Sequence, residues 1–543
     1  MVLILALLGC SPATVSNDTA TRDTAPPATE APEIPEMDAR KLLIRASLDL
    51  RGVRPTLAEL DAVDADPTSL DPMIDGFLHD PRFEGRVRDL FSEIWLTRVD
   101  DLALGPGALG LDDEATYLRA VGDEALRMVG HIAANDLPYT DLVVGDWTMA
   151  DETTAAIWPL DYPGGTGWHV ARYTDGRPPA GVLSTNGLWW RYESTDANAN
   201  RGRANAVARI LLCNDYLTAE VSFDRDIVLV DDDDVLDAVR TEPACAACHD
   251  TLDPLAAYLF GFSWDEDVPS DSSTYHVGRE RQWEDALELP PSYYGEPGYA
   301  LTDLGRQIAS DERFVSCAVE QVTSLLLRRD LTDADEDLLA SHREAFLAED
   351  VTLRALFRSV VDDPRYRAGP TEAEDAVPLK MATPDLLADQ VEDLTGYRMA
   401  SAGFDMMQND TVGVRTLAGG ADGLTVTRTT TSPNPTIALV QQRLAEGAAR
   451  YVVERDLVDA PASPTLLQHV DLDDTPATAP AAFDAAIVHL HRRIFGTVVH
   501  AGDPQVTELI GLWSDVYAID ADPVEAWSAV VAVLLRDPDF LLY

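Results

Sequence analysis

Apolar residues recur every three or four positions along most of the chain after residue 38. The stretches 318–329 and 385–394 illustrate this spacing, which places the apolar side chains on one face of an α-helix. Between about 143 and 235 the helical spacing weakens, and β-branched and aromatic residues there predict short strands or irregular packed loops. The pattern therefore predicts a mainly α-helical protein with minor irregular β-structure.

One short pattern occurs three times at the end of an apolar helical stretch. The sequences FLHDPRF (77–83), VVDDPRY (360–366) and LLRDPDF (534–540) each run into Asp-Pro, with an aromatic residue two positions later. Because proline disfavours helix in the residue before it, each helix should end at this point. We expect the aromatic ring to fold back onto the end of the helix.

Acidic residues outnumber basic residues by more than two to one. The 94 Asp and Glu residues and 41 Lys and Arg residues give a formal net charge of −53 at pH 7. Because nucleic acids are bound by concentrated Lys and Arg, this balance argues against a nucleic-acid-binding role. The acidic surface is compatible equally with basic partners or cations and with a high-salt environment. The four aspartates at 231–234 lack the Gly and Glu of a known calcium loop, so we expect a solvated turn there.

The N-terminus has the features of a bacterial lipoprotein signal. An apolar run from Val2 to Leu8 leads into Leu-Leu-Gly-Cys, in which Cys10 would be lipidated and become the new N-terminus. The following residues, 11–37, are rich in Ser, Thr, Ala, Pro and acid, which suits a disordered tether. We therefore expect an exported periplasmic or outer-membrane lipoprotein held to the membrane by its lipid. The alternative is an apolar N-terminus with a chance cysteine.

The sequence CAACH at 245–249 carries the most specific chemical signal. Cys245 and Cys248 have the spacing that forms thioethers with the two vinyl groups of a haem, and the adjacent His249 can bind the iron. A zinc site would need further ligands at a similar spacing, and a thioredoxin-like dithiol would need a strand before it and a helix after it. A plain disulfide between the two cysteines is the remaining alternative. The motif predicts one haem c per chain.

Two further cysteines occur in apolar helical contexts. If Cys213 and Cys317 meet, their disulfide would tie the segment before CAACH to the helix after it. Two separately buried thiols would be equally compatible with the sequence.

The motif and its surroundings resemble a known group of proteins. CAACHDTLDPL (245–255), with the flanking segments over about 38–368, is similar to the planctomycete-type cytochrome C-like exported proteins, multidomain proteins whose domains have no assigned function. The resemblance after residue 379 is looser. It implies Cys245 and Cys248 as thioether positions and His249 as the proximal iron ligand, and no other residue role.

One departure from the related proteins follows directly after the motif. Their Asp-Pro-Leu usually continues with Gly-Phe, whereas this chain has Ala256 and Ala257.

The sequence does not identify a sixth iron ligand. No methionine lies between Cys248 and Met381, although methionine is a common sixth ligand of c-type electron carriers. His276 and His169 are candidates, and Met149 and Met381 are more distant ones. An open sixth position would instead admit peroxide or oxygen.

The segment before the motif contains the main basic cluster. Arg201, Arg203 and Arg209 could pair with the haem propionates, or could form a solvated helix face that balances local acid. Four aromatic residues could line the haem or belong to an ordinary core: Trp189, Trp190, Phe260 and Phe262.

The chain of 543 residues is too long for a single core, so we expect several domains. The predicted parts are a signal peptide at 1–10, a tether at 11–37, an N-terminal helical domain at 38–142, a cytochrome c-like haem module with closing helices at 143–368, a linker at 369–378 and a C-terminal helical domain at 379–543.

These features predict electron transfer as the function, with a redox partner protein and no nucleic acid. Two alternatives remain open, a haem-dependent oxidoreductase or peroxidase acting outside the cytoplasm and a non-catalytic surface scaffold. The familiar hydrolase, zinc-protease and NTPase motifs do not occur, so no catalytic side chain is predicted. The sequence makes no prediction of the oligomeric state.

Overall fold

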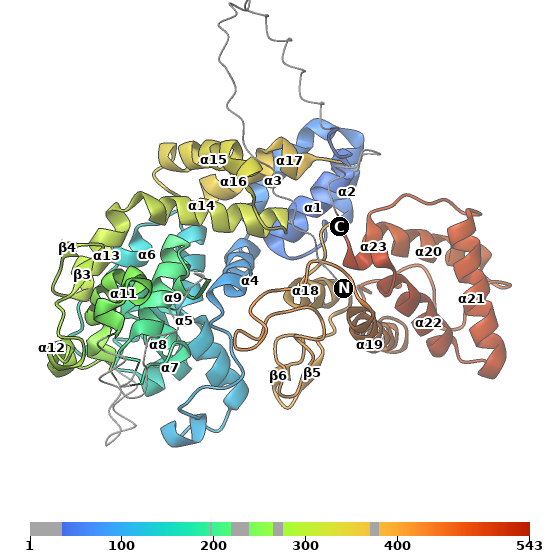
Figure 1. The fold of residues 1–543 in the computed structure, drawn as a ribbon. Helices are drawn as coiled ribbons and strands as arrows, with labels where there is room; N and C mark the ends of the chain where they lie inside the picture. Colours follow the sequence, from blue (N-terminus) through green and yellow to red (C-terminus); the bar gives the residue numbers. More distant parts are fainter. Residues whose placement is uncertain (1–34, 196–197, 219–237, 264–274, 370–378) are drawn as a thin grey trace, which may run out of the picture.

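The computed structural model describes residues 35–195, 198–218, 238–263, 275–369 and 379–543. This part of the chain is mainly α-helical, and its strands form three short antiparallel pairs (Figure 1). The predicted fold class is therefore confirmed.

The N-terminal helices pack through α1 and α4. They are α1 (Ala39–Arg51), α2 (Leu57–Ala65), α3 (Leu70–Phe77), α4 (Arg82–Trp95) and α5 (Glu114–Ala134). Helix α1 begins at Asp38, whose side chain accepts a hydrogen bond from the Arg40 amide, and ends at Gly52, which has a φ of 74°. Helix α1 contacts α2, α3 and α4, and α4 also contacts α5, so α1 and α4 connect this group.

The middle of the chain begins with short elements. These are α6 (Asp141–Val144), β1 (Thr148–Ala150), α7 (Glu152–Ile157), β2 (His169–Ala171) and α8 (Asn186–Arg191). Strands β1 and β2 pair antiparallel, with Met149 opposite Val170. The aromatic stretch around Trp189 and Trp190, for which we expected strands or irregular loops, is helical. Helix α8 packs against α5, so tertiary burial outweighs the strand preference of its aromatic residues.

Eight further α-helices and one strand pair follow in the rest of the described middle region. They are α9 (Arg201–Leu212), α11 (Pro243–Ala256), α12 (Trp283–Ala286), α13 (Leu301–Ser310), α14 (Glu312–Leu327), α15 (Glu336–Ala348), α16 (Leu353–Asp362) and α17 (Pro364–Arg367), with β3 (Ser292–Tyr293) paired to β4 (Glu296–Pro297). Helix α9 packs against both α11 and α14.

The C-terminal part forms the brown and red side of Figure 1. Its elements are α18 (Pro384–Thr395), β5 (Ala400–Ser401), β6 (Phe404–Asp405), α19 (Pro435–Val453), α20 (Pro480–Phe495), α21 (Pro504–Asp520), α22 (Pro523–Leu535) and α23 (Pro538–Leu541). Helix α22 packs against α19 and α21.

The three Asp-Pro-aromatic patterns end helices as predicted. Helices α3, α16 and α22 stop before the proline, and the aromatic residues Phe83, Tyr366 and Phe540 are buried. The structure adds a second role for the aspartate. Its side chain accepts a hydrogen bond from the backbone amide two residues later, and in this way Asp363 and Asp537 cap α17 and α23.

Contacts cross the predicted boundary between the N-terminal and C-terminal bodies. Lys380 Nζ lies 2.5 Å from Asp49 Oδ2 of α1, and Tyr543 donates a hydrogen bond to the other oxygen of the same carboxylate. Arg54 donates to Gln390 of α18 at 3.0 Å. The two bodies therefore share buried polar contacts, and residues 370–378 of the predicted linker lie outside the described residues.

Candidate functional site

Helix α11 carries the CAACH motif on one face. Cys245, Cys248 and His249 are related by spacings of three and four residues, which bring side chains to the same side of a helix. Both cysteines are half-buried and free, so they do not form a disulfide with each other. The face therefore presents two thiols and an imidazole together.

The imidazole of His249 is held by a carboxylate on its own helix. His249 Nδ1 lies 2.8 Å from Asp253 Oδ1, four residues further along α11. This contact occupies Nδ1 and leaves Nε2 as the nitrogen that can bind a metal. The relation was visible in the sequence, because an acid four residues after a histidine shares its helix face.

Asp253 is also held from the neighbouring helix. Arg201, the first residue of α9, donates from Nε to Oδ1 at 2.7 Å and from Nη2 to Oδ2 at 2.9 Å. Burial acts to raise the pKa of Asp253, but the hydrogen bonds from Arg201 and His249 outweigh it and hold the pKa below its usual range. Asp253 is thus an anion shared between a guanidinium and an imidazole.

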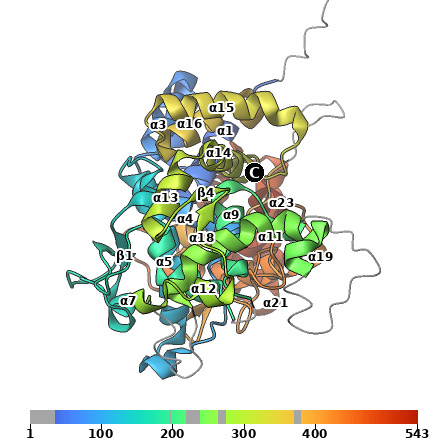
Figure 2. The same cartoon turned by 60° about the vertical axis from the view of Figure 1, so that its left-hand side comes forward.

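His249 opens onto a cavity of about 1240 Å³. Helix α11 contributes His249 and Leu252 to its wall, and the rest comes from α9 and from segments near residues 96–103, 190–193, 215–218 and 423–428. Helices α9 and α11, which both contribute to this wall, lie next to each other (Figure 2). A space of this size is larger than a typical small-ligand pocket of about 300–1,000 Å³.

Two arginines in the cavity wall contact neutral acceptors. Arg191 donates to the carbonyls of Leu96 and Gly423, and Arg209 donates to the carbonyl of Ile94 and to the Tyr192 hydroxyl. No Asp or Glu among the described residues forms an ion pair with either arginine. Their charges can meet an anionic group in the cavity, whose wall also contains Asp101, Glu193 and Asp215.

The three arginines of the predicted basic cluster have different environments. Arg201 binds Asp253, and Arg209 lines the cavity with it. Arg203 is buried and donates to the backbone carbonyls of Tyr192, Phe262 and Trp189, so it is neither in the cavity wall nor on a solvated helix face.

The predicted sixth-ligand candidates do not line this cavity. His169 lies in β2, with Nε2 3.1 Å from the Thr166 carbonyl, and the backbone of His276 bonds to Gly261. Met149 and Met381 are buried elsewhere in the core. Among the described residues of the wall, His249 is the single histidine, and no methionine occurs.

Most of the predicted aromatic wall belongs to the core. Trp190 lines the cavity, whereas Trp189, Phe260 and Phe262 are buried in the main core. The ring centroids of Trp189 and Phe262 are 5.8 Å apart.

A disulfide joins Cys213 to Cys317, with Cα atoms 5.2 Å apart. Of the two arrangements compatible with the sequence, the structure thus has the paired one. Cys213 directly follows α9, and Cys317 lies in α14. The disulfide therefore fixes the C-terminal end of α9, whose first residue, Arg201, binds Asp253.

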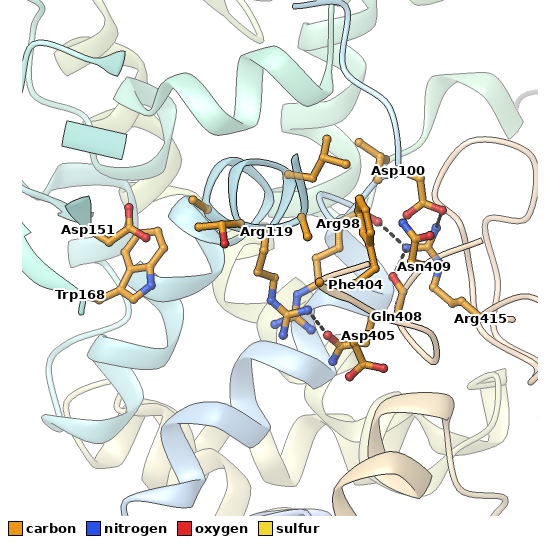
Figure 3. Close-up of a pocket in the computed structure, with 16 residues that line it drawn as sticks. Arg98, Asp100, Arg119, Asp151, Trp168, Phe404, Asp405, Gln408, Asn409 and Arg415 are labelled. Atoms are coloured by element: carbon orange, nitrogen blue, oxygen red, sulfur yellow. Dashed lines mark hydrogen bonds and ion pairs between the residues drawn. The ribbon is translucent and has the colours of Figure 1, made fainter. Parts of the chain in front are cut away.

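A second hollow, of about 290 Å³, lies between α5 and the segment that contains β6 (Figure 3). Three arginines point into this region, but each has partners. Arg98 pairs with Asp123 at 2.8 Å, Arg415 pairs with Asp100 at 3.1 Å, and Arg119 bonds to Gln408 and Asp123. The three arginine charges are thus paired with carboxylates of the protein, and the hollow lies between residues of the N-terminal and C-terminal bodies.

Comparison of the chain with family models, curated proteins and solved structures finds no match. No helix in the described part of the chain is long and apolar enough to cross a membrane. The described residues also contain no group of three or more His, Cys, Asp or Glu side chains suited to a metal ion. Within the described part of the chain, a zinc site at Cys245 and Cys248 therefore has no further set of ligands, since Cys213 and Cys317 are bonded to each other.

Proposed function

We propose that this protein is an exported, monohaem c-type cytochrome-like protein that transfers electrons. One observation carries the proposal: His249 opens onto a large cavity from the same helix face that holds the free Cys245 and Cys248. Covalent attachment through two cysteines and iron ligation by the next histidine require this combination of groups.

The groups on this face of α11 and in the cavity wall fit a haem, with His249 and Leu252 in the wall and the two cysteines on the helix beside it. Cys245 and Cys248 would hold its vinyl groups as thioethers, and His249 Nε2 would bind the iron. Arg191 and Arg209 supply two guanidinium groups without carboxylate partners, which match two propionates. A haem bound in this way supplies one-electron redox chemistry.

The protein contributes position and shielding. Asp253 holds the imidazole ring through Nδ1, and Arg201 links this pair to α9. Trp190 and Leu252 are apolar side chains in the cavity wall, and they lower the local dielectric constant around the redox centre. The disulfide at the end of α9 keeps that helix in place against α14.

The attachment is tested by expression with a cytochrome c maturation system. We expect a haem-stained band that survives boiling in denaturant and is lost in the Cys245→Ala/Cys248→Ala variant. The control is Cys213→Ala/Cys317→Ala, which removes the same number of cysteines; it weakens the fold but leaves both thioether positions in place, so the stain, which is read after denaturation, should remain. A wild-type band without haem stain would contradict the proposal. A stain that persists in the variant without Cys245 and Cys248 would also contradict it.

A haem-dependent oxidoreductase or peroxidase is the second candidate. It is favoured by the described cavity wall, which offers no second histidine and no methionine as a sixth ligand. A low-spin spectrum that is insensitive to cyanide, imidazole and peroxide would support electron transfer. A high-spin spectrum, cyanide binding and peroxide turnover would support the second candidate instead.

We also propose that the protein is anchored by lipid at Cys10, outside the described residues, in the periplasm or at the outer membrane. Its net charge of −53 suits a basic redox partner, because complementary charge accelerates encounter. Globomycin or Cys10→Ser should release the protein from the membrane fraction. Unchanged retention would refute the anchor.

A further inference from the structure

We propose that Asp253 is a positioning residue that sets the electron-donating strength of His249, and that Arg201 limits this effect. The inference rests on the proposed function, because it concerns His249 as an iron ligand. The inference goes further than the proposed function, because it assigns control of the reduction potential to Asp253 and Arg201, which lie outside the CAACH motif.

The geometry supports an electronic role for the carboxylate. Asp253 Oδ1 accepts hydrogen bonds from His249 Nδ1 at 2.8 Å and from Arg201 Nε at 2.7 Å. The side chain of Asp253 is 5% exposed, so solvent screens these interactions weakly. Asp253 and His249 lie four residues apart on one helix, so the backbone of α11 fixes their distance.

A ligating histidine that donates Nδ1–H to a carboxylate is fixed in one tautomer and becomes a stronger base. A more basic ligand stabilises ferric iron relative to ferrous iron, and so lowers the reduction potential. Arg201 donates a hydrogen bond to the same oxygen of Asp253, and its positive charge reduces the negative charge that His249 experiences. The two residues should therefore affect the potential in opposite directions.

The first test is Asp253→Asn, which keeps the size of the side chain and an acceptor oxygen but removes the charge. We expect its reduction potential to rise, with at least a tenfold change in the ferric-to-ferrous ratio at fixed potential, which is about 59 mV for a one-electron couple. Arg201→Gln should lower the potential, because it removes positive charge from the same carboxylate.

Asp250→Asn is the matched control. Asp250 is adjacent to His249 on α11 but is exposed, so water screens its charge. Asp250→Asn should therefore change the reduction potential by only a fraction of the change seen for Asp253→Asn.

The potentials are measured by spectroelectrochemical titration of the full-length holoprotein. A wild type without covalent haem would refute the proposed function, whereas a haem-loaded wild type whose potential is unchanged by Asp253→Asn would refute this inference alone. A rise in the reduction potential of both Asp253→Asn and Arg201→Gln would also overturn the inference, because loss of packing would then explain the result. If Asp253→Asn yields no folded holoprotein, Arg201→Gln decides: a lower potential supports the inference, and an unchanged or higher one overturns it.

Discussion

Removal of the disulfide between Cys213 and Cys317 should strongly destabilise the region around the cavity. The bond closes a loop with a sequence separation of 104 residues, which contains all of α11. We propose the double variant Cys213→Ala/Cys317→Ala as the perturbation. Alanine is preferable to serine at position 317, because the Cys317 side chain is buried and a hydroxyl there would add the cost of an unsatisfied polar group.

The expected magnitude follows from the loop length. In the chain-entropy description, cross-linking a loop of this size lowers the entropy of the unfolded chain and stabilises the fold by about 4.7 kcal/mol. The loss of contacts in the folded state is small by comparison, since Gln321 keeps its 2.8 Å hydrogen bond to the Ile210 carbonyl beside the bond.

The assay is equilibrium urea unfolding followed by circular dichroism, with wild type measured under oxidising and reducing conditions. We expect the double variant to lose about 4–5 kcal/mol in the free energy of unfolding and reduced wild type to behave like it. A single Cys213→Ala variant, which also prevents the bond, should match the double variant. A loss below about 1 kcal/mol in all three would refute the reasoning, because the bond would then not constrain the unfolded chain.

Two further predictions concern the core. Burial acts to raise the pKa of Asp123, but Arg98 and three other arginines outweigh it and hold the pKa far below its usual range, so its contribution to stability is present at neutral pH and is lost as the pH falls below about 4. Asp123→Asn should therefore cost about 3–5 kcal/mol at pH 7 and less at pH 3 in urea unfolding, and an equal cost at both pH values would contradict the assignment. Gly305→Ala would place a Cβ 2.1 Å from the Val143 carbonyl oxygen and should cost about 3 kcal/mol in the same assay. The matched Gly511→Ala, which meets no atom within 4 Å, should be neutral or stabilising by about 1 kcal/mol, and equal effects of the two glycine variants would show that the close approach is not limiting.

Features set by local spacing could be predicted from the sequence. The period of apolar residues identified the helical fold, and the Asp-Pro-aromatic patterns marked three helix ends. The sequence did not predict that the CAACH segment is helical; with α11 known, its spacing places Cys245, Cys248 and His249 on one face.

Features that depend on distant segments could not be predicted in this way. The cavity wall combines residues near 96–103 and 423–428 with α9 and α11, and no local pattern connects them. The pairing of Arg201 with Asp253 likewise depends on the packing of α9 against α11. Helix α8 was missed because its aromatic residues favour strands in general, whereas burial against α5 decides its structure here.

The most direct test of the central claim is a pyridine haemochrome measurement on the purified chain after expression with a cytochrome c maturation system, combined with mass analysis of the peptide that contains Cys245 and Cys248. We predict one haem per chain, covalently attached to that peptide. A colourless protein with free, zinc-bound or disulfide-bonded Cys245 and Cys248 would contradict the claim.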